Sequence, residues 1–177
     1  MTAWPVLTTA DLPLAELGAS VLDGELFRFD AVFAPIDEFD RPAVRAASIV
    51  RVASPRHIAE RHSAAWVLGA LDDPPRRHEL CASVAARTSS AMPGVRVREV
   101  VIDEDDLVRV AGLGVTTPVR TVVDLARTAA GFEAADRATC RRLLALGDAD
   151  AEACRELIER RRNLPNKRQT WDRIRSL

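Results

Sequence analysis

Tyrosine is absent from this chain of 177 residues, and aromatic residues together make up only 5% of it. The sole lysine is Lys167, and the remaining basic residues are arginines. The apolar residues, 47% of the chain, are mostly Ala, Val and Leu, and 29% of the residues are charged. This composition buries a core while keeping a charged surface, and its small side chains favour helices packed at close range.

Long apolar runs are also missing, since no window approaches the roughly 20 apolar residues that a transmembrane helix needs. Residues 1–12 lack the basic start and the apolar stretch of a secretory signal peptide. The three cysteines, Cys81, Cys140 and Cys154, form no C-x-x-C pair. An odd number of isolated cysteines favours buried thiols in a reducing compartment over a disulfide or a metal site. We therefore expect a cytoplasmic protein.

Charge is unevenly distributed along the chain, although the formal net charge is only −1. Residues 1–40 hold eight acidic side chains against Arg28 alone, a net charge of −7. Residues 151–177 hold eight basic side chains against four acidic ones, a net charge of +4. A polyanion is therefore repelled by the first segment and attracted by the last.

The first 40 residues have the pattern of a helix followed by a β-hairpin. Residues 8–11 are typical of a helix start, apolar residues recur at helical spacing over residues 14–22, and Gly24 ends the segment. The alternating run of residues 25–34 predicts one or two short strands. A helix, a turn and a β wing in this order outline a small winged helix-turn-helix.

The rest of the chain alternates helical and extended patterns, which predicts a mixed α/β fold. Helices are predicted over residues 43–52, 56–68, 133–146 and 150–162, and a short one after Pro165; strands are predicted over residues 79–86 and 95–102, with short apolar pieces at residues 107–110 and 113–115. Thr117 and Pro118 form a strong helix start. Within that helix Arg120 and Asp124 stand four residues apart, the spacing of an ion pair on one face.

Three stretches have the form of motifs known from one protein family. Residues 22–28 (LDGELFR) followed by residues 32–35 (VFAP) look like a winged-helix wing, and residues 62–69 (HSAAWVLG) are similar to a helix of that family. A third and more specific stretch combines GVRVR at residues 94–98, GVTTP at residues 114–118 and DLA at residues 124–126. Together they resemble the AbiEi-type antitoxins of type IV toxin–antitoxin systems, over roughly residues 8–150.

The resemblance implies two domains: a DNA-binding winged helix, which falls on residues 1–40, and a mixed α/β antitoxin domain with C-terminal helices and a basic tail over residues 41–177. The short and acidic first segment makes this winged helix a small, degenerate one. It implies a non-enzymatic transcriptional regulator that neutralises a nucleotidyltransferase toxin and represses their shared operon. The expected partners are then the cognate toxin and operator DNA. No membrane, cofactor or small-molecule substrate is expected.

Two departures from the family pattern concern DNA binding. The predicted recognition helix, residues 13–22, contains no Arg or Lys, and the wing's Gly-Val-Tyr appears here as Ala31-Val32-Phe33. Because cationic side chains supply most of the non-specific affinity for DNA, we place the candidate DNA contacts elsewhere in the chain. They are Arg28, Arg41, Arg45, Arg51, Arg160, Arg161, Arg162, Lys167, Arg168, Arg173 and Arg175.

Other polar motifs have structural interpretations. Residues 117–124 are interpreted as a helix cap with an ion pair, and the acidic residues 103–106 as a solvated turn, because they are sequential rather than converging. His57 and His62 stand five residues apart, on different faces of a helix, and no Cys or acid completes a tetrahedral metal site. We therefore predict that the three histidines, His78 included, have structural roles. We also predict that the chain has neither catalytic nor metal-binding residues.

Two other functions stay open. A protein-interaction module that descends from such antitoxins and has lost DNA binding is favoured by the acidic residues 1–40. A nuclease remnant is the third; metal-dependent cleavage that is lost on replacing Asp103, Asp105 or Asp106 would reveal it.

Replacing Arg160, Arg161 and Arg162 by Ala should weaken the binding of DNA. The loss should be the same for the DNA upstream of the gene as for DNA of other sequences, because phosphate contacts carry no sequence information. A gel shift over a range of salt concentrations measures this, since binding by a regulator weakens steeply with salt. An unchanged affinity and salt slope in the variant would remove these residues from the interface, and no shift at any salt concentration would favour the interaction module.

Overall fold

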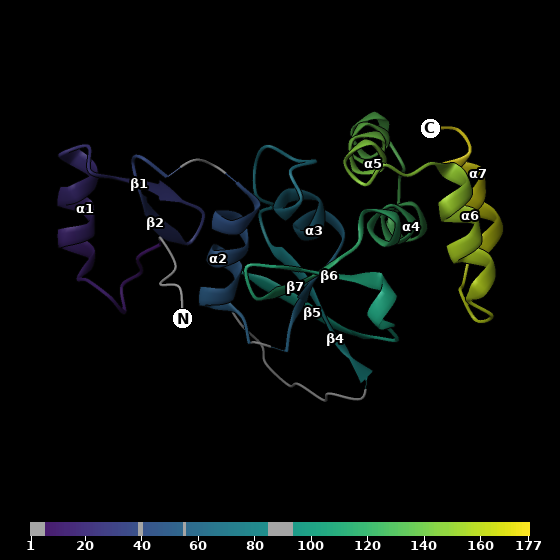
Figure 1. The fold of residues 1–177 in the computed structure, drawn as a ribbon, viewed down its shortest axis with the longest axis horizontal. Helices are drawn as coiled ribbons and strands as arrows, with labels where there is room; N and C mark the ends of the chain where they lie inside the picture. Colours follow the sequence, from purple (N-terminus) through teal and green to yellow (C-terminus); the bar gives the residue numbers. More distant parts are fainter. Residues whose placement is uncertain (1–5, 39–40, 55, 85–93) are drawn as a thin grey trace.

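The computed structural model describes residues 6–38, 41–54, 56–84 and 94–177. These residues form a mixed α/β fold, as the sequence predicts. The elements follow one another along the long axis, with the first helix at one end, the main sheet in the middle and the last two helices at the other end (Figure 1). Among the described residues, no helix combines the length and the apolar character that crossing a membrane requires.

The N-terminal part is a helix packed on a β-hairpin. α1 (Leu14–Leu22) is followed by β1 (Leu26–Phe29) and β2 (Val32–Pro35), which pair antiparallel. Leu17, Leu26 and Phe33 form a small core between the helix and the hairpin. The strands occur where alternation predicts them.

The predicted helix start at residues 8–11 is wrong. Asp11 accepts hydrogen bonds from the backbone nitrogen of Thr8 at 2.8 Å and from its hydroxyl at 2.9 Å, which closes a turn. The helix begins only at Leu14, after Pro13. A residue that satisfies its own neighbours' donors in this way competes with helix formation.

α2 (Pro42–Val52) connects the hairpin to the main sheet. Val44 and Ala47 pack against Val32 and Ala34 of the hairpin, while Ala46 and Ile49 belong to the core of the sheet. One helix thus contributes side chains to both cores. The division of the chain at residue 40 stays a prediction.

The main sheet has five strands in the order β5-β4-β3-β7-β6, with β3–β7 and β4–β5 parallel and the other neighbours antiparallel. The strands are β3 (Ile58–Ala59), β4 (His78–Ser83), β5 (Val95–Val100), β6 (Leu107–Val110) and β7 (Leu113–Thr116). β4 and β5 confirm the predicted strands, of which residues 85 and 86 lie outside the described residues.

The helix predicted over residues 56–68 is wrong in its first half. Ile58 pairs with Cys81 on one side and with Gly114 on the other, so that β3 forms the centre of the sheet. α3 (Arg61–Val67) begins only after this strand. A Cβ atom at Gly114 would lie 3.1 Å from Cγ1 of Ile58, and the missing side chain lets the two strands meet there.

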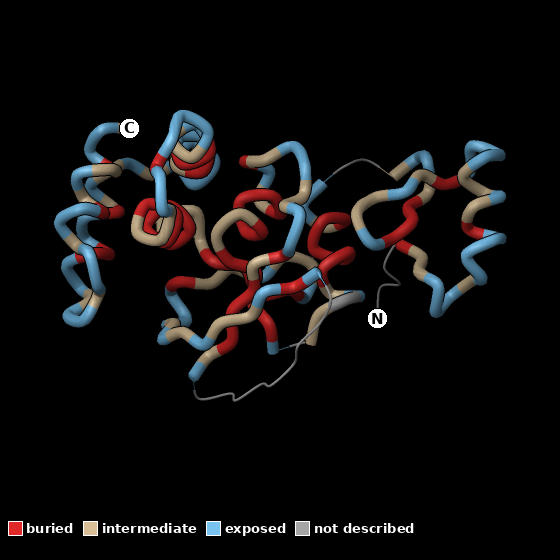
Figure 2. The backbone as a smooth tube through the Cα atoms, turned by 180° about the vertical axis from the view of Figure 1, so that it is seen from behind, coloured by how far each residue is buried: buried red, intermediate tan, exposed pale blue. Residues whose placement is uncertain are grey.

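Four helices complete the fold: α4 (Pro118–Thr128), α5 (Ala134–Leu146), α6 (Ala151–Arg160) and α7 (Lys167–Ile174). α4 packs against α3 and against each of the other three, and all four occur where the sequence predicts them. Burial is concentrated in the sheet, α3 and α4, whereas α1, α6 and α7 expose their outer faces (Figure 2). Cys81, Cys140 and Cys154 are buried free thiols, as predicted.

A polar clamp holds the turn of the hairpin. Oδ2 of Asp30 accepts a hydrogen bond from Oγ of Ser48 on α2 at 3.0 Å and lies 2.9 Å from Nε2 of His78 on β4. Asp30 has a backbone φ of 52°, in the left-handed region. Although burial opposes ionisation, the hydrogen bonds from His78 and Ser48 lower the pKa of Asp30 below its ordinary value.

Replacing Asp30 by Asn should lower the free energy of unfolding at pH 7 by about 1–2 kcal/mol, since Asn tolerates the left-handed backbone but lacks the charge that His78 and Ser48 contact. Because the pKa of Asp30 is lower in the folded state, its contribution is present above about pH 4 and is lost as the pH falls through the folded-state value. Urea unfolding between pH 3 and pH 7 measures it. The exposed Asp37→Asn is the control, and equal curves for both variants would contradict the clamp.

Candidate functional site

α4 carries the central residues of the candidate site and begins as predicted. Oγ1 of Thr117 accepts a hydrogen bond from the backbone nitrogen of Arg120 at 3.2 Å, and Pro118 occupies the first turn, where no backbone donor is needed. Nε of Arg120 donates to Oδ2 of Asp124 at 2.8 Å. The predicted ion pair is thus present. It is also buried, with 4% of Arg120 and 1% of Asp124 exposed.

Asp124 is shared by three guanidinium groups. Besides Arg120, Arg127 donates to its Oδ1 at 3.0 Å, and Nη2 of Arg98 on β5 lies 3.6 Å from its Oδ2. Burial opposes the charged form, but Arg120 lowers the pKa of Asp124 below its ordinary value. The carboxylate therefore stays ionised in the interior and ties α4 to the sheet.

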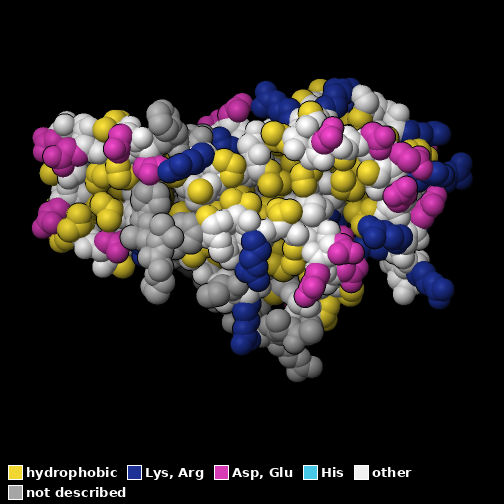
Figure 3. All heavy atoms as spheres, viewed as in Figure 1, with side chains coloured by type: hydrophobic (Ala, Val, Ile, Leu, Met, Phe, Trp, Pro, Cys, Tyr) yellow, Lys and Arg dark blue, Asp and Glu magenta, His cyan; other side chains and the backbone are white. Residues whose placement is uncertain are grey.

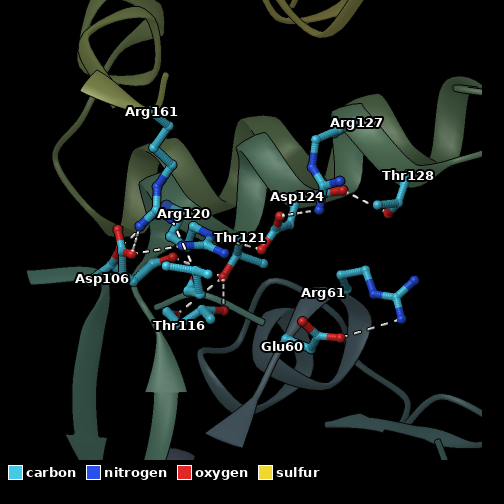
Figure 4. Close-up of polar contacts among 12 residues, drawn as sticks. Glu60, Arg61, Asp106, Thr116, Arg120, Thr121, Asp124, Arg127, Thr128 and Arg161 are labelled. Atoms are coloured by element: carbon cyan, nitrogen blue, oxygen red, sulfur yellow. Dashed lines mark hydrogen bonds and ion pairs between the residues drawn. The ribbon is translucent and has the colours of Figure 1, made fainter. Parts of the chain in front are cut away.

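Two more buried carboxylates extend this network (Figure 4). Asp106 lies in a short 3₁₀ helix before β6, contacts Arg120 at 2.7 Å and accepts a hydrogen bond from Arg161. Glu60 lies between β3 and α3 and accepts two hydrogen bonds from Arg98, at 2.5 and 2.6 Å. The expectation of a solvated turn is wrong for Asp106, which is 3% exposed, because two guanidiniums compensate its charge.

A hollow of about 520 Å³ lies in front of this network. Its walls come from β5 and the following loop, from α4 and from residues 160–165, which include the last residue of α6 and the segment after it. Six arginines line it: Arg98, Arg120, Arg127, Arg160, Arg161 and Arg162. Basic and acidic side chains are interleaved over the end of the molecule where α6 and α7 lie, whereas acidic ones prevail over the end with α1 (Figure 3).

Several predicted DNA contacts instead form hydrogen bonds or ion pairs within the protein. Arg45 is buried and donates to the carbonyl oxygens of Trp66 and Leu71, at 2.6 and 2.7 Å. Arg51 donates to the carbonyl oxygen of Val6 at 3.2 Å. Likewise, Arg173 donates to two carbonyl oxygens at the end of α4, and Arg161 binds Asp106.

The other predicted contacts lie at two separate places. Arg28 and Arg41 belong to the hairpin and to the start of α2, where Arg41 pairs with Glu38 at 2.5 Å. The remaining five lie near the C-terminus: Arg160, Arg162, Lys167, Arg168 and Arg175. Arg175 pairs with Asp172 at 2.9 Å. In this structure the predicted set forms no continuous patch across the described residues.

Of the six arginines that line the hollow, only those at residues 160–162 are candidate contacts predicted from the sequence. The structure adds Arg98, Arg120 and Arg127 to them. The spacing of Arg127 and Asp124, three apart on a helix, was a local signal for one of these contacts. Arg98 and Glu60 are 38 residues apart, and no local pattern connects them.

Away from the hollow, a serine, a histidine and an aspartate are connected one after another by hydrogen-bonding contacts. Oγ of Ser63 lies 3.1 Å from Nδ1 of His78, whose Nε2 contacts Asp30. Ser63 is fully buried and accepts a hydrogen bond from the backbone nitrogen of Glu79. Since no substrate reaches a buried hydroxyl, this chain of contacts is structural.

The other two histidines are also placed by protein contacts. Nδ1 of His57 accepts a hydrogen bond from the backbone nitrogen of Ser54 at 3.1 Å. His62 lies 2.9 Å from Glu79, and this hydrogen bond raises the pKa of His62 above its ordinary value. Within the described ranges, no three His, Cys, Asp or Glu side chains are placed to hold a metal ion.

A family model described as the AbiEi antitoxin C-terminal domain matches residues 46–177. The chain belongs to the AbiEi antitoxin family. The matched residues include the main sheet, the carboxylate network and the arginine-lined hollow, whereas α1 and the hairpin lie outside them. Membership supports the role of an antitoxin in a toxin–antitoxin system.

The fold is similar to the crystal structure of the RV2827C protein from Mycobacterium tuberculosis, with a TM-score of 0.50 and 21% sequence identity. The likeness covers 96% of this chain and 69% of that chain. At this identity the comparison concerns the fold. None of the curated proteins that were compared matches the AbiEi-family chain described here.

Replacing Asp124 by Asn should lower the free energy of unfolding by about 3–5 kcal/mol, because it leaves buried guanidiniums without their shared counter-ion. Unfolding by urea at pH 7 measures the loss. The matched control is Asp105→Asn, which removes the same charge from an exposed position and should change stability by less than about 0.5 kcal/mol. Similar losses in the two variants would contradict the central place of Asp124.

Proposed function

We propose that this protein is the antitoxin of a type IV toxin–antitoxin pair, that it neutralises a nucleotidyltransferase toxin in the cytoplasm and that it represses its own operon by binding operator DNA. The family match over residues 46–177 carries the proposal. The protein acts without catalysis, by presenting shaped and charged surfaces to its partners.

The C-terminal segment is the part best suited to contact DNA phosphates. Arg160, Arg162 and Arg168 are exposed, and none of them forms an ion pair within the described part of the chain. Exposed guanidiniums make the charge-assisted contacts that give DNA-binding proteins their affinity. We therefore assign the DNA contact to the C-terminal segment. That residues 1–40 form a winged helix is a further part of the proposal.

The second candidate is an antitoxin-derived interaction module that has lost DNA binding, and α1 favours it. This helix contains Glu16 but no basic residue, and it exposes 64% of Leu14 and 89% of Leu22. Apolar side chains on an acidic helix suit a protein partner better than a phosphate backbone.

The proposal predicts that a gene beside this one encodes a nucleotidyltransferase toxin, and that co-expression of this protein restores the growth that the toxin alone inhibits. An inactive toxin variant is the control for expression burden. Absence of protection by the full chain would reject the antitoxin role.

Operator binding is tested separately by gel shift with a Lys167→Ala/Arg168→Ala variant, whose residues lie outside the hollow. Loss of two phosphate contacts should reduce the salt slope by about 2, since each contact contributes about 1. The control Arg142→Ala/Arg155→Ala removes two exposed arginines elsewhere and should keep the slope. No binding by the wild type at any salt concentration would leave the interaction module as the function.

A further inference from the structure

The arginine-lined hollow has the size of a small-molecule site. Its volume of about 520 Å³ lies within the roughly 300–1000 Å³ that is typical of ligand pockets. It is open to solvent between α4 and residues 160–165. Its lining combines six guanidinium groups with apolar side chains and with two carboxylates, Glu99 and Asp103, of which Asp103 pairs with Arg161 at 3.1 Å. A small-molecule site goes beyond the proposed function.

The floor of the hollow is held rigid from behind. Arg120 is fixed between Asp106 and Asp124, at 2.7 and 2.8 Å, and Arg98 makes two hydrogen bonds to Glu60. These side chains are ordered by the protein itself, so binding does not have to immobilise them. A ligand therefore meets a preformed surface of guanidinium groups.

The carboxylates do not use all of the N–H donors on the walls. Each guanidinium has five N–H groups, yet Asp124 alone serves three guanidiniums. The buried Nε atoms of Arg127 and Arg161 have no hydrogen-bond partner among the described residues. Arg160 and Arg162 add two positive charges that no ion pair within the described ranges compensates. This surplus suits an anion with many oxygen acceptors.

The lining of the hollow also includes apolar side chains. Val101, which is 69% exposed, lines it together with Leu164 and Pro165. An inorganic anion makes no use of such side chains, whereas the ring of a base packs on them. The lining thus matches a molecule that carries both a phosphate chain and a flat apolar group.

We propose that the hollow binds a nucleoside di- or triphosphate. Its phosphates contact Arg127, Arg160 and Arg162, and its base packs against apolar side chains of the lining, Val101, Leu164 and Pro165. The phosphorylated end of a nucleic acid presents the same chemistry, and the test separates these two sources.

Isothermal titration of the full chain with ATP and GTP tests the proposal. Wild type is compared with Arg160→Ala/Arg162→Ala, whose side chains are exposed and support no buried contact in the described structure. Arg142→Ala/Arg155→Ala removes the same charge outside the hollow. We expect at least one nucleotide to bind the Arg160→Ala/Arg162→Ala variant at least about tenfold more weakly than wild type, because charge-assisted hydrogen bonds are lost. Its affinity for the Arg142→Ala/Arg155→Ala variant should stay within about twofold of that for wild type.

Three further ligands assign the recognition. Adenosine without phosphate should not bind, and inorganic tripolyphosphate should bind more weakly than the nucleotide because it does not use the apolar side chains of the lining. A 5′-phosphorylated oligonucleotide that binds while ATP and GTP do not would overturn the proposal in favour of a nucleic-acid end. Preferential binding of a poly-glutamate peptide would overturn it in favour of an acidic protein segment.

Absence of nucleotide binding at millimolar concentration, or equal weakening by both double variants, would also overturn the proposal. Arg127→Gln provides a second variant on the α4 wall and should weaken the binding of both the nucleotide and tripolyphosphate, because the phosphates of both contact Arg127. Toxin neutralisation and operator binding are measured without nucleotide, so that failure of this inference is distinguishable from failure of the proposed function.

Discussion

The attraction between the buried carboxylate of Asp124 and three guanidinium groups is the constraint around which the sheet and the C-terminal helices are arranged. An ionised group in the interior carries a desolvation cost of several kcal/mol, so its partners must be brought to it when the chain folds. Arg98 comes from β5, while Arg120 and Arg127 come from α4. A buried network of this kind contributes little net stability. It does restrict how the two elements dock, because other arrangements leave a charge uncompensated.

The same contacts shape the surface that the antitoxin domain presents. Arginines that neutralise Asp106, Asp124 and Glu60 also line the hollow, together with Arg160 at the end of α6 and Arg162 just after it. At the opposite end α1 is acidic and partly apolar. The molecule therefore offers two surfaces of different chemistry, and the proposed contacts with a toxin and with DNA could use them separately.

Local patterns predicted most of the elements. The cap at Thr117, the ion pair of Arg120 with Asp124, the hairpin and the C-terminal helices all depend on residues within one or two turns of each other, and the structure confirms them. β3 was missed because two residues carry no periodicity and its pairing partners are distant in sequence. The hollow was missed for the same reason, since Glu60 meets Arg98 only once β3, β4 and β5 are aligned.

Arg173 connects the last helix, α7, to the end of α4, and this contact matters when the chain is shortened. Its Nη1 donates to the carbonyl oxygens of Ala126 and Ala129, at 2.7 and 2.9 Å, and so satisfies acceptors that the end of α4 leaves open. Arg127 lies in that same turn. A chain shortened before Arg173 exposes these acceptors to water and loosens the turn that carries Arg127. The C-terminal helix therefore supports the position of a residue that lines the hollow.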